Sequence, residues 1–151
     1  EEYEITRVKV LDERGEESLG KPIGTYITIQ VPKLKNADQD LRDKIAQVLA
    51  KEIKGLGKNY KNTKTLIIGL GNWNVTPDAL GPKVVDRVLV RQYFVAYKKD
   101  EDETVANVSA LSPGVMGLTG IETSEIVKGI VEKTHPDLVI AIDALASRRM
   151  D

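Results

Sequence analysis

The chain has 151 residues, and its 22 basic and 23 acidic residues leave a net charge of -1. This length fits one domain of roughly 100–200 residues, and the near balance of charge argues against a broad basic surface for nucleic acid. The absence of cysteine and the single histidine exclude disulfides, thiolate metal sites and a two-histidine metal site. No apolar run approaches the roughly 18 residues of a membrane span, and the first residues do not resemble a signal peptide. We therefore expect one globular domain over residues 1–151, with no metal, no cofactor, no membrane association and no direct nucleic-acid partner.

The first third of the chain predicts two strands and a long helix. Residues 4–11 and 25–31 alternate apolar and polar side chains, which is typical of strands, and this N-terminal pair can be antiparallel. The charged segment between them contains two glycines and predicts a turn or a short helical piece. Residues 38–56 predict a helix whose start is capped by Asp38 or Asp40. Its apolar residues fall at helical spacing on one face, and these are Leu41, Ile45, Val48, Leu49, Ile53 and Leu56.

The rest of the chain contains further strand patterns. Residues 65–70 and 138–142 are short apolar runs without alternation, which predicts strands buried on both faces. Residues 105–111 predict a strand followed by a loop over the next six residues. Residues 93–97 predict one more short strand, and the charge run 98–103 predicts a solvated loop.

Two predicted helices alternate with these strands. Gly81-Pro82 opens the first, because proline is tolerated at the first helical position. Its inner side is expected to hold Val84, Val85, Val88 and Leu89. The second is capped by Thr123 or Ser124 and is broken by Pro136. Alternating strands and helices predict an α/β fold with an open, mostly parallel twisted sheet and helices on both faces. In such sheets the working site lies beyond the carboxyl ends of the strands.

That rule selects two aspartates as candidate catalytic residues. The strand 65–70 leads into a polar loop that contains Asp78, and the strand 138–142 is followed at once by Asp143. If both strands are parallel neighbours, the two carboxylates converge at one crevice. Two close carboxylates cannot easily both ionise, so one holds a proton while the other stays charged. Such a pair can activate a water and protonate a leaving group without a metal or a thiol.

Each aspartate also fits the start of a helix, and spacing alone favours this capping role. Asp143 precedes a possible helix over 144–149, and Asp78 lies just before the predicted helix that follows it. Position along the strand separates these two from other titratable residues. Asp137 lies about 20 Å from Asp143, at the opposite end of the same strand, and cannot share the site. His135 lies at that same end, so we expect a structural or surface role for it.

Two glycine-containing segments could bind ligands. The Gly-Leu-Gly string 69–71 suggests a dinucleotide fingerprint, but Asn74 stands where that fingerprint needs a third glycine. Nucleotide binding is therefore disfavoured. The segment 114–120 precedes a helix and could hold an anion, bind a peptide backbone or simply turn a corner, and the sequence leaves these alternatives open.

Three sequence blocks carry a resemblance to a known family. The blocks are GLGNWNVTPDALGP at 69–82, PGVMGLTGIETS at 113–124 and PDLVIAIDALA at 136–146. They closely resemble the germination protease of spore-forming bacteria, an atypical aspartic endopeptidase whose fold is similar to that of the hydrogenase-maturation endopeptidases. The resemblance implies a zymogen that assembles as a homotetramer in the cytoplasm of the spore core. Its substrates would be the small acid-soluble proteins that coat DNA in dormant spores.

The resemblance also implies site residues. The family's two catalytic aspartates match Asp78 and Asp143. We expect other residues of the same motifs to bind substrate or support the site, namely Gly71, Asn72, Asn74, Thr76, Gly114, Met116 and Thr119. Family members are about twice as long as this chain, so residues 1–151 are expected to be a catalytic core from a longer protein.

Two other functions remain open at this point. In a metal-dependent peptidase of the maturation type, Asp78 and Asp143 would ligate a divalent ion, and a chelator would abolish activity. In a non-catalytic binding module, the shortened chain would bind substrate or partners without cutting them.

Overall fold

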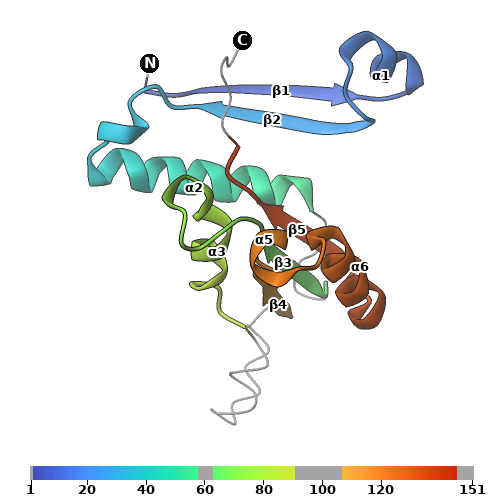
Figure 1. The fold of residues 1–151 in the computed structure, drawn as a ribbon. Helices are drawn as coiled ribbons and strands as arrows, with labels where there is room; N and C mark the ends of the chain where they lie inside the picture. Colours follow the sequence, from blue (N-terminus) through green and yellow to red (C-terminus); the bar gives the residue numbers. More distant parts are fainter. Residues whose placement is uncertain (1, 58–62, 91–106, 146–151) are drawn as a thin grey trace. The chain divides into compact units, whose positions relative to one another are not determined.

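The computed structural model describes residues 2–57, 63–90 and 107–145. The chain divides into two compact units, Glu1–Lys58 and Asn59–Asp151 (Figure 1), which we describe one at a time. The expectation that the whole chain forms one domain stays a prediction. Among the described residues, no helix combines the length and the apolar character needed to cross a membrane.

The first unit is built on an antiparallel hairpin. Strand β1 (Glu4–Val10) pairs with β2 (Gly24–Gln30) in a register that runs from Glu4 opposite Gln30 to Val10 opposite Gly24. The short helix α1 (Glu13–Leu19) connects the strands, and Asp12 caps its start by accepting a hydrogen bond from the Gly15 N–H at 3.0 Å. Both strands and the short helical piece between them are therefore confirmed.

A short 3₁₀ turn, η1 (Leu34–Asn36), precedes the long helix α2 (Gln39–Leu56). Asp38 is its cap, since the Asp38 Oδ1 accepts a hydrogen bond from the Leu41 N–H at 2.9 Å. An ion pair between Arg7 and Glu52 ties α2 to β1. Only the first part of the expected apolar face is half-buried. Its last members are exposed, namely Leu49, Ile53 and Leu56.

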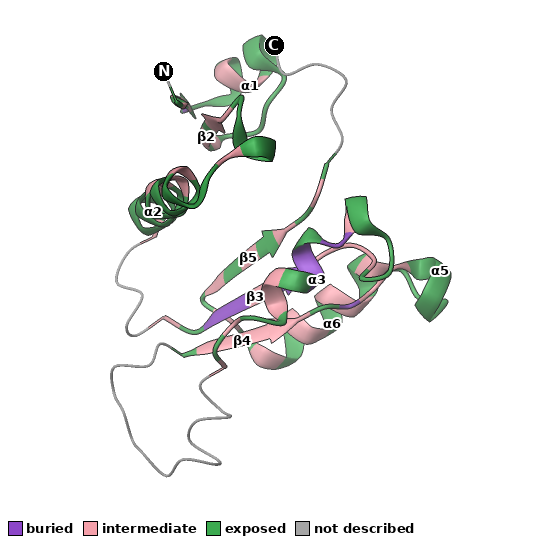
Figure 2. Ribbon diagram, turned by 90° about the vertical axis from the view of Figure 1, so that its left-hand side faces the viewer, coloured by how far each residue is buried: buried purple, intermediate pink, exposed green. Residues whose placement is uncertain are grey.

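The second unit contains a three-stranded parallel sheet with the order β4-β3-β5. Its strands are β3 (Thr65–Gly69), β4 (Val108–Leu111) and β5 (Leu138–Ile142). The central strand β3 is buried on both faces as expected, and Figure 2 shows the buried residues concentrated in β3 and near α3.

The expectation of two-sided burial is wrong for β5. Within the described residues β5 is an edge strand, its burial alternates, and Val139 is 40% exposed. Apolar composition identifies a strand that can be buried, but it does not reveal how many neighbours pair with that strand.

Helices cover both faces of this open sheet, so the predicted fold class is confirmed (Figure 1). Helix α3 (Leu80–Val85) follows β3, and α6 (Thr123–Thr134) connects β4 to β5. Helix α3 is shorter than expected: Leu89 lies beyond it and is exposed, so it does not line an inner face.

The start of α6 also differs from expectation. Its cap is Glu122, which makes no side-chain capping bond. The Thr123 hydroxyl donates instead to the Gly114 carbonyl at 3.2 Å, because the preceding loop folds back against the helix start. Helix α6 ends before Pro136 as expected, with His135 in the left-handed region at φ 47°.

The loop after β4 contains a short helix, α5 (Met116–Thr119), where a plain loop was expected. The described part of the predicted strand 105–111 is confirmed as β4. The predicted strand 93–97 and loop 98–103 lie outside the described residues.

Candidate active site

Two hydrogen bonds that involve Asp78 close the loop between β3 and α3. The Asn72 N–H donates to Asp78 Oδ2 at 2.8 Å, and the Asp78 N–H donates to the Val75 carbonyl at 2.8 Å. Gly71 has a φ of +116°, and a Cβ built there would lie 2.0 Å from the Asp78 carbonyl oxygen. Only glycine therefore allows the chain to return so closely, and the half-buried Asp78 is held at a defined place in the loop.

The other loop residues singled out from the sequence support this arrangement. The Asn72 Oδ1 accepts a hydrogen bond from the Asn74 N–H at 3.0 Å, which forms an Asx-type turn. Thr76 begins the 3₁₀ turn η3 (Thr76–Asp78) that ends at the aspartate. Asp78 therefore does not cap α3, whose cap is Ala79 without a side-chain hydrogen bond, and the capping interpretation of Asp78 is wrong.

A contact between two glycines sets α3 against the end of the sheet. A Cβ on Gly69 would lie 2.2 Å from the Gly81 carbonyl oxygen. A Cβ on Gly81 would lie 2.3 Å from the Leu70 carbonyl oxygen and 2.5 Å from the Ile142 carbonyl oxygen. The glycines of the 69–71 string therefore serve close packing and a turn, which accounts for them without a bound nucleotide.

Asp143 lies at the same edge of the sheet as the Asp78 loop. Strands β3 and β5 are parallel neighbours with Gly69 opposite Ile142, and the Leu70 N–H donates to the Ile142 carbonyl at 2.8 Å. Asp143 follows Ile142 directly, is exposed, and accepts a hydrogen bond from the Ala144 N–H at 2.8 Å. The expected placement of both aspartates beyond the carboxyl ends of neighbouring parallel strands is confirmed.

The described residues that follow Asp143 do not begin the helix that it could cap. Residues 144 and 145 are not helical, and the remainder of the possible helix 144–149 lies outside the described residues.

A third loop starts at this edge because β4 runs parallel to β3. Gly114 turns the chain with a φ of +76°, and Met116 begins α5. The Thr119 hydroxyl donates to the Ile121 carbonyl at 3.0 Å and accepts from the Ile121 N–H at 3.1 Å. Gly114 and Thr119 thus give the loop its shape, while the Met116 side chain is exposed.

Asp137 and His135 lie at the end of the sheet where the strands begin, opposite to the end that holds Asp78 and Asp143. Asp137 Oδ2 accepts a hydrogen bond from the Lys64 N–H at 2.8 Å, and the Asp137 N–H donates to the Lys64 carbonyl at 2.8 Å. Asp137 therefore joins the amino ends of β3 and β5. His135 ends α6 on the same side, so both residues lie away from the aspartate pair.

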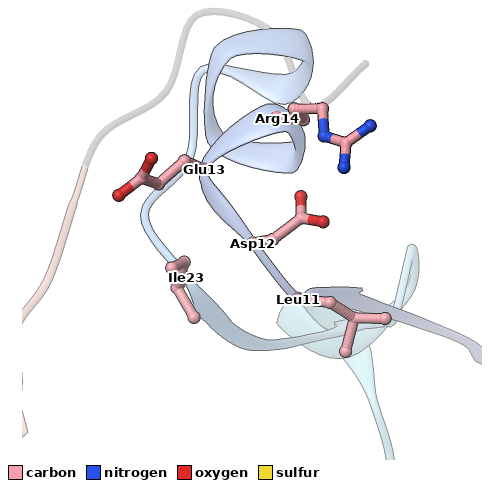
Figure 3. Close-up of a pocket in the computed structure, with 5 residues that line it drawn as sticks. All are labelled: Leu11, Asp12, Glu13, Arg14 and Ile23. Atoms are coloured by element: carbon pink, nitrogen blue, oxygen red, sulfur yellow. The ribbon is translucent and has the colours of Figure 1, made fainter.

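Two other features bear on binding chemistry. A pocket of about 440 Å³ lies in the first unit, between the end of β1 and the start of β2 (Figure 3). It is lined by Leu11, Asp12, Glu13, Arg14 and Ile23, none of which belongs to the sheet edge that holds the aspartates. In the described part of the chain, no group of three or more His, Asp or Glu side chains is arranged to hold a metal ion.

Comparison with known proteins agrees with the motifs at this edge. The model of the germination protease family matches residues 1–151. The germination protease of Caldanaerobacter subterraneus subsp. tengcongensis is 54% identical over 152 residues, which cover 100% of this chain and 47% of that protein. The germination protease of Oceanobacillus iheyensis is 53% identical over 148 residues, covering 93% of this chain and 40% of that protein. The germination protease of Clostridium perfringens (strain ATCC 13124) is 45% identical over 152 residues, which cover 100% of this chain and 47% of that protein. The chain thus spans about half the length of the curated relatives it matches, and it belongs to the germination protease family.

Proposed function

We propose that this chain carries the catalytic aspartates of an endopeptidase that degrades small acid-soluble spore proteins during germination. The observation that carries the proposal is the position of Asp78 and Asp143, which follow the carboxyl ends of neighbouring parallel strands in a chain that matches the family along its whole length. The substrate follows from the resemblance of the three sequence blocks to germination proteases.

The hydrogen bonds at the two carboxylates fit this role. Each carboxylate has one oxygen fixed by a backbone N–H, from Asn72 for Asp78 and from Ala144 for Asp143. Within the described residues neither carboxylate accepts a second hydrogen bond, so each has an oxygen available for water or substrate. Anchoring one oxygen restricts the rotation of the carboxylate, which lowers the cost of aligning it for proton transfer.

The reaction needs one ionised and one protonated carboxyl group. The ionised aspartate takes a proton from a water molecule while the water oxygen attacks the scissile carbonyl carbon. The protonated aspartate then gives its proton to the leaving amine as the C–N bond breaks. The proton taken from water remains on the first aspartate, and the second aspartate is now ionised. One proton transfer from the first to the second restores the starting state for the next cycle.

The wider biological setting belongs to the same proposal. By resemblance to the family, the full-length protein would be made as a zymogen, would assemble as a homotetramer and would act in the cytoplasm of the spore core. Substrate proteins, rather than nucleic acid, would be its direct partners.

Cleavage by a chimera tests the proposal. These 151 residues replace the matched segment of the Caldanaerobacter germination protease, so that the longer protein surrounds them. The chimera is incubated with a small acid-soluble spore protein, and the fragments are identified by mass. We expect Asp78→Asn and Asp143→Asn each to abolish cleavage with the fold intact, whereas Asp86→Asn, at an exposed aspartate after α3, serves as a matched control and cleaves normally.

Two results would overturn the proposal. Normal turnover by either Asp78→Asn or Asp143→Asn would remove that residue from the catalytic pair. Loss of cleavage on adding a chelator, with recovery on adding a divalent ion, would favour the metal-dependent alternative instead.

A further inference from the structure

The described segments that follow the three parallel strands contain no cationic side chain. These segments are residues 70–79 after β3, 112–122 after β4 and 143–145 after β5, and none of their residues is Lys, Arg or His. The proposed reaction uses one aspartate as a base toward water and the other as an acid toward the leaving amine. From these segments, only a neutral hydrogen-bond donor can therefore stabilise the scissile carbonyl oxygen, which becomes an oxyanion when water attacks.

Asn72 is the half-buried side-chain donor in these segments. Its backbone N–H donates to Asp78 Oδ2 at 2.8 Å, and its carbonyl accepts a hydrogen bond from the Val75 N–H at 3.1 Å. The backbone of Asn72 is thus fixed on both sides, next to one of the two candidate carboxylates. The other side-chain donors of these segments belong to exposed residues, namely Trp73, Asn74, Thr76, Ser112 and Thr119.

The loop also orients the side-chain amide of Asn72. Its Oδ1 accepts a hydrogen bond from the Asn74 N–H at 3.0 Å, which determines which end of the amide is oxygen and which is nitrogen. Within the described residues the Nδ2 group donates to no protein atom, so its N–H groups are available to a ligand. A donor that is held in place before charge develops stabilises that charge without a cost of reorganisation.

The place of Asn72 beside Asp78 suits a donor to the substrate carbonyl. A water that is hydrogen-bonded to a carboxylate and lies about 3 Å from a carbonyl carbon puts that carbon within about 6 Å of the carboxylate. Asn72 contacts the carboxylate of Asp78 through its backbone, so its amide shares the neighbourhood in which the attacked carbonyl has to lie.

We propose that Asn72 is a further catalytic residue, whose Nδ2 group donates a hydrogen bond to the oxyanion of the tetrahedral intermediate. The inference rests on the proposed endopeptidase function and adds the group that stabilises the charge on oxygen. As the water oxygen bonds to the carbonyl carbon, the π electron pair moves onto the carbonyl oxygen and the Nδ2 group stabilises it. The pair returns to the C=O bond when the C–N bond breaks and the nitrogen takes the proton of the second aspartate. Asn72 itself transfers no proton.

Two substitutions in the chimera separate the Nδ2 donor from the other properties of Asn72. Asn72→Asp keeps an oxygen that accepts from the Asn74 N–H but adds a charge at neutral pH, whereas Asn72→Ala adds no charge but loses that acceptor. Both remove the Nδ2 donor. Cleavage of a small acid-soluble spore protein at several substrate concentrations gives kcat and KM separately. We expect kcat to fall by about 10²- to 10³-fold in each variant, with KM within about threefold of the original.

Asn107→Asp is the matched control. It makes the same amide-to-carboxylate change on an exposed residue of the same unit, directly before β4 at the opposite end of the sheet. It should cleave normally. Thermal melting of the chimera, followed by circular dichroism, checks the fold. Asn72→Asp should melt within about 3 °C of the original, because the turn that Asn72 forms with Asn74 is retained.

Four outcomes would overturn the inference. Normal kcat in either Asn72 variant would show that the reaction does not need the Nδ2 donor. A loss confined to KM would assign Asn72 to substrate binding instead of the oxyanion. An equal loss in Asn107→Asp would show that the effect is not specific to the site. A melting temperature of Asn72→Asp that falls by more than about 3 °C would assign the residue a structural role. The catalytic proposal is tested separately, by the loss of cleavage in Asp78→Asn and Asp143→Asn.

Discussion

Gly81→Ala tests whether the close contact between α3 and the sheet holds the candidate site together. The Cβ of alanine would lie 2.3 Å from the Leu70 carbonyl oxygen, 2.5 Å from the Ile142 carbonyl oxygen and 2.6 Å from the Leu70 nitrogen. All three atoms are backbone, so no side-chain rotation can relieve the overlap. Either α3 moves away from the sheet or the carboxyl ends of β3 and β5 separate.

The expected cost exceeds that of an ordinary overpacked core. Inserting a methyl group into a packed core lowers the free energy of unfolding by about 1–3 kcal/mol. Because rigid backbone atoms surround Gly81 on several sides, we expect Gly81→Ala to lower it by about 3 kcal/mol or more. For a protein of this size that corresponds to a fall in melting temperature of about 6–12 °C. The same displacement would shift the Asp78 loop relative to Asp143, so cleavage by the chimera should also fall.

Thermal unfolding monitored by Trp73 fluorescence reports on the second unit, which contains this contact. Gly129→Ala is the control, since Gly129 lies within α6 and a Cβ there meets nothing within 4 Å. It should raise stability by about 0.8–1 kcal/mol through helix propensity. A Gly81→Ala protein that melts within about 2 °C of the original would refute the packing argument.

Two further predictions concern the first unit. Asp38→Ala should lower the free energy of unfolding by about 1 kcal/mol, because it removes the cap that accepts a hydrogen bond from the Leu41 N–H. Asp40→Ala should lower it by less. Equal losses in urea denaturation would contradict the assignment of Asp38 as the cap. The hydrogen bond from Arg7, followed by its charge, lowers the pKa of Glu52 below the ordinary value of 4.5. A lowered pKa in the folded state adds stability above pH 4.5 that is lost as the pH falls through the folded-state value. The urea midpoints of the original chain and Glu52→Gln should therefore differ at neutral pH and converge as the pH falls through the folded-state pKa of Glu52, and a constant gap would argue against this coupling.

The sequence predicted the placement of the catalytic candidates better than their contacts. A rule that depends only on strand direction put Asp78 and Asp143 at one sheet edge, and the parallel pairing of β3 with β5 confirms it. The partner of Asp78 could not be predicted in the same way. The local alternative was a helix cap, but the carboxylate accepts instead from Asn72, because Gly71 allows the loop to turn back.

Non-local packing accounts for the other differences. The string LVIAI at 138–142 has the composition of a central strand, yet β5 lies at an edge in the described part of the sheet. Likewise, Thr123 has the right residue type for a cap, but its hydroxyl bonds to Gly114 in the loop from β4. The close approach of Gly69 and Gly81 also depends on how α3 meets the sheet, which residue spacing alone does not specify.

The central claim is that Asp78 and Asp143 act as one catalytic unit, and a double-mutant cycle in the chimera tests it most directly. Turnover of a small acid-soluble spore protein is measured for Asp78→Asn, for Asp143→Asn and for the double variant. If the two carboxyl groups share one proton-transfer sequence, each single variant loses about 10²- to 10⁴-fold or more, and the double variant loses little beyond that. Losses that multiply in the double variant, or a single variant that retains full turnover, would show that the two aspartates do not act as a pair.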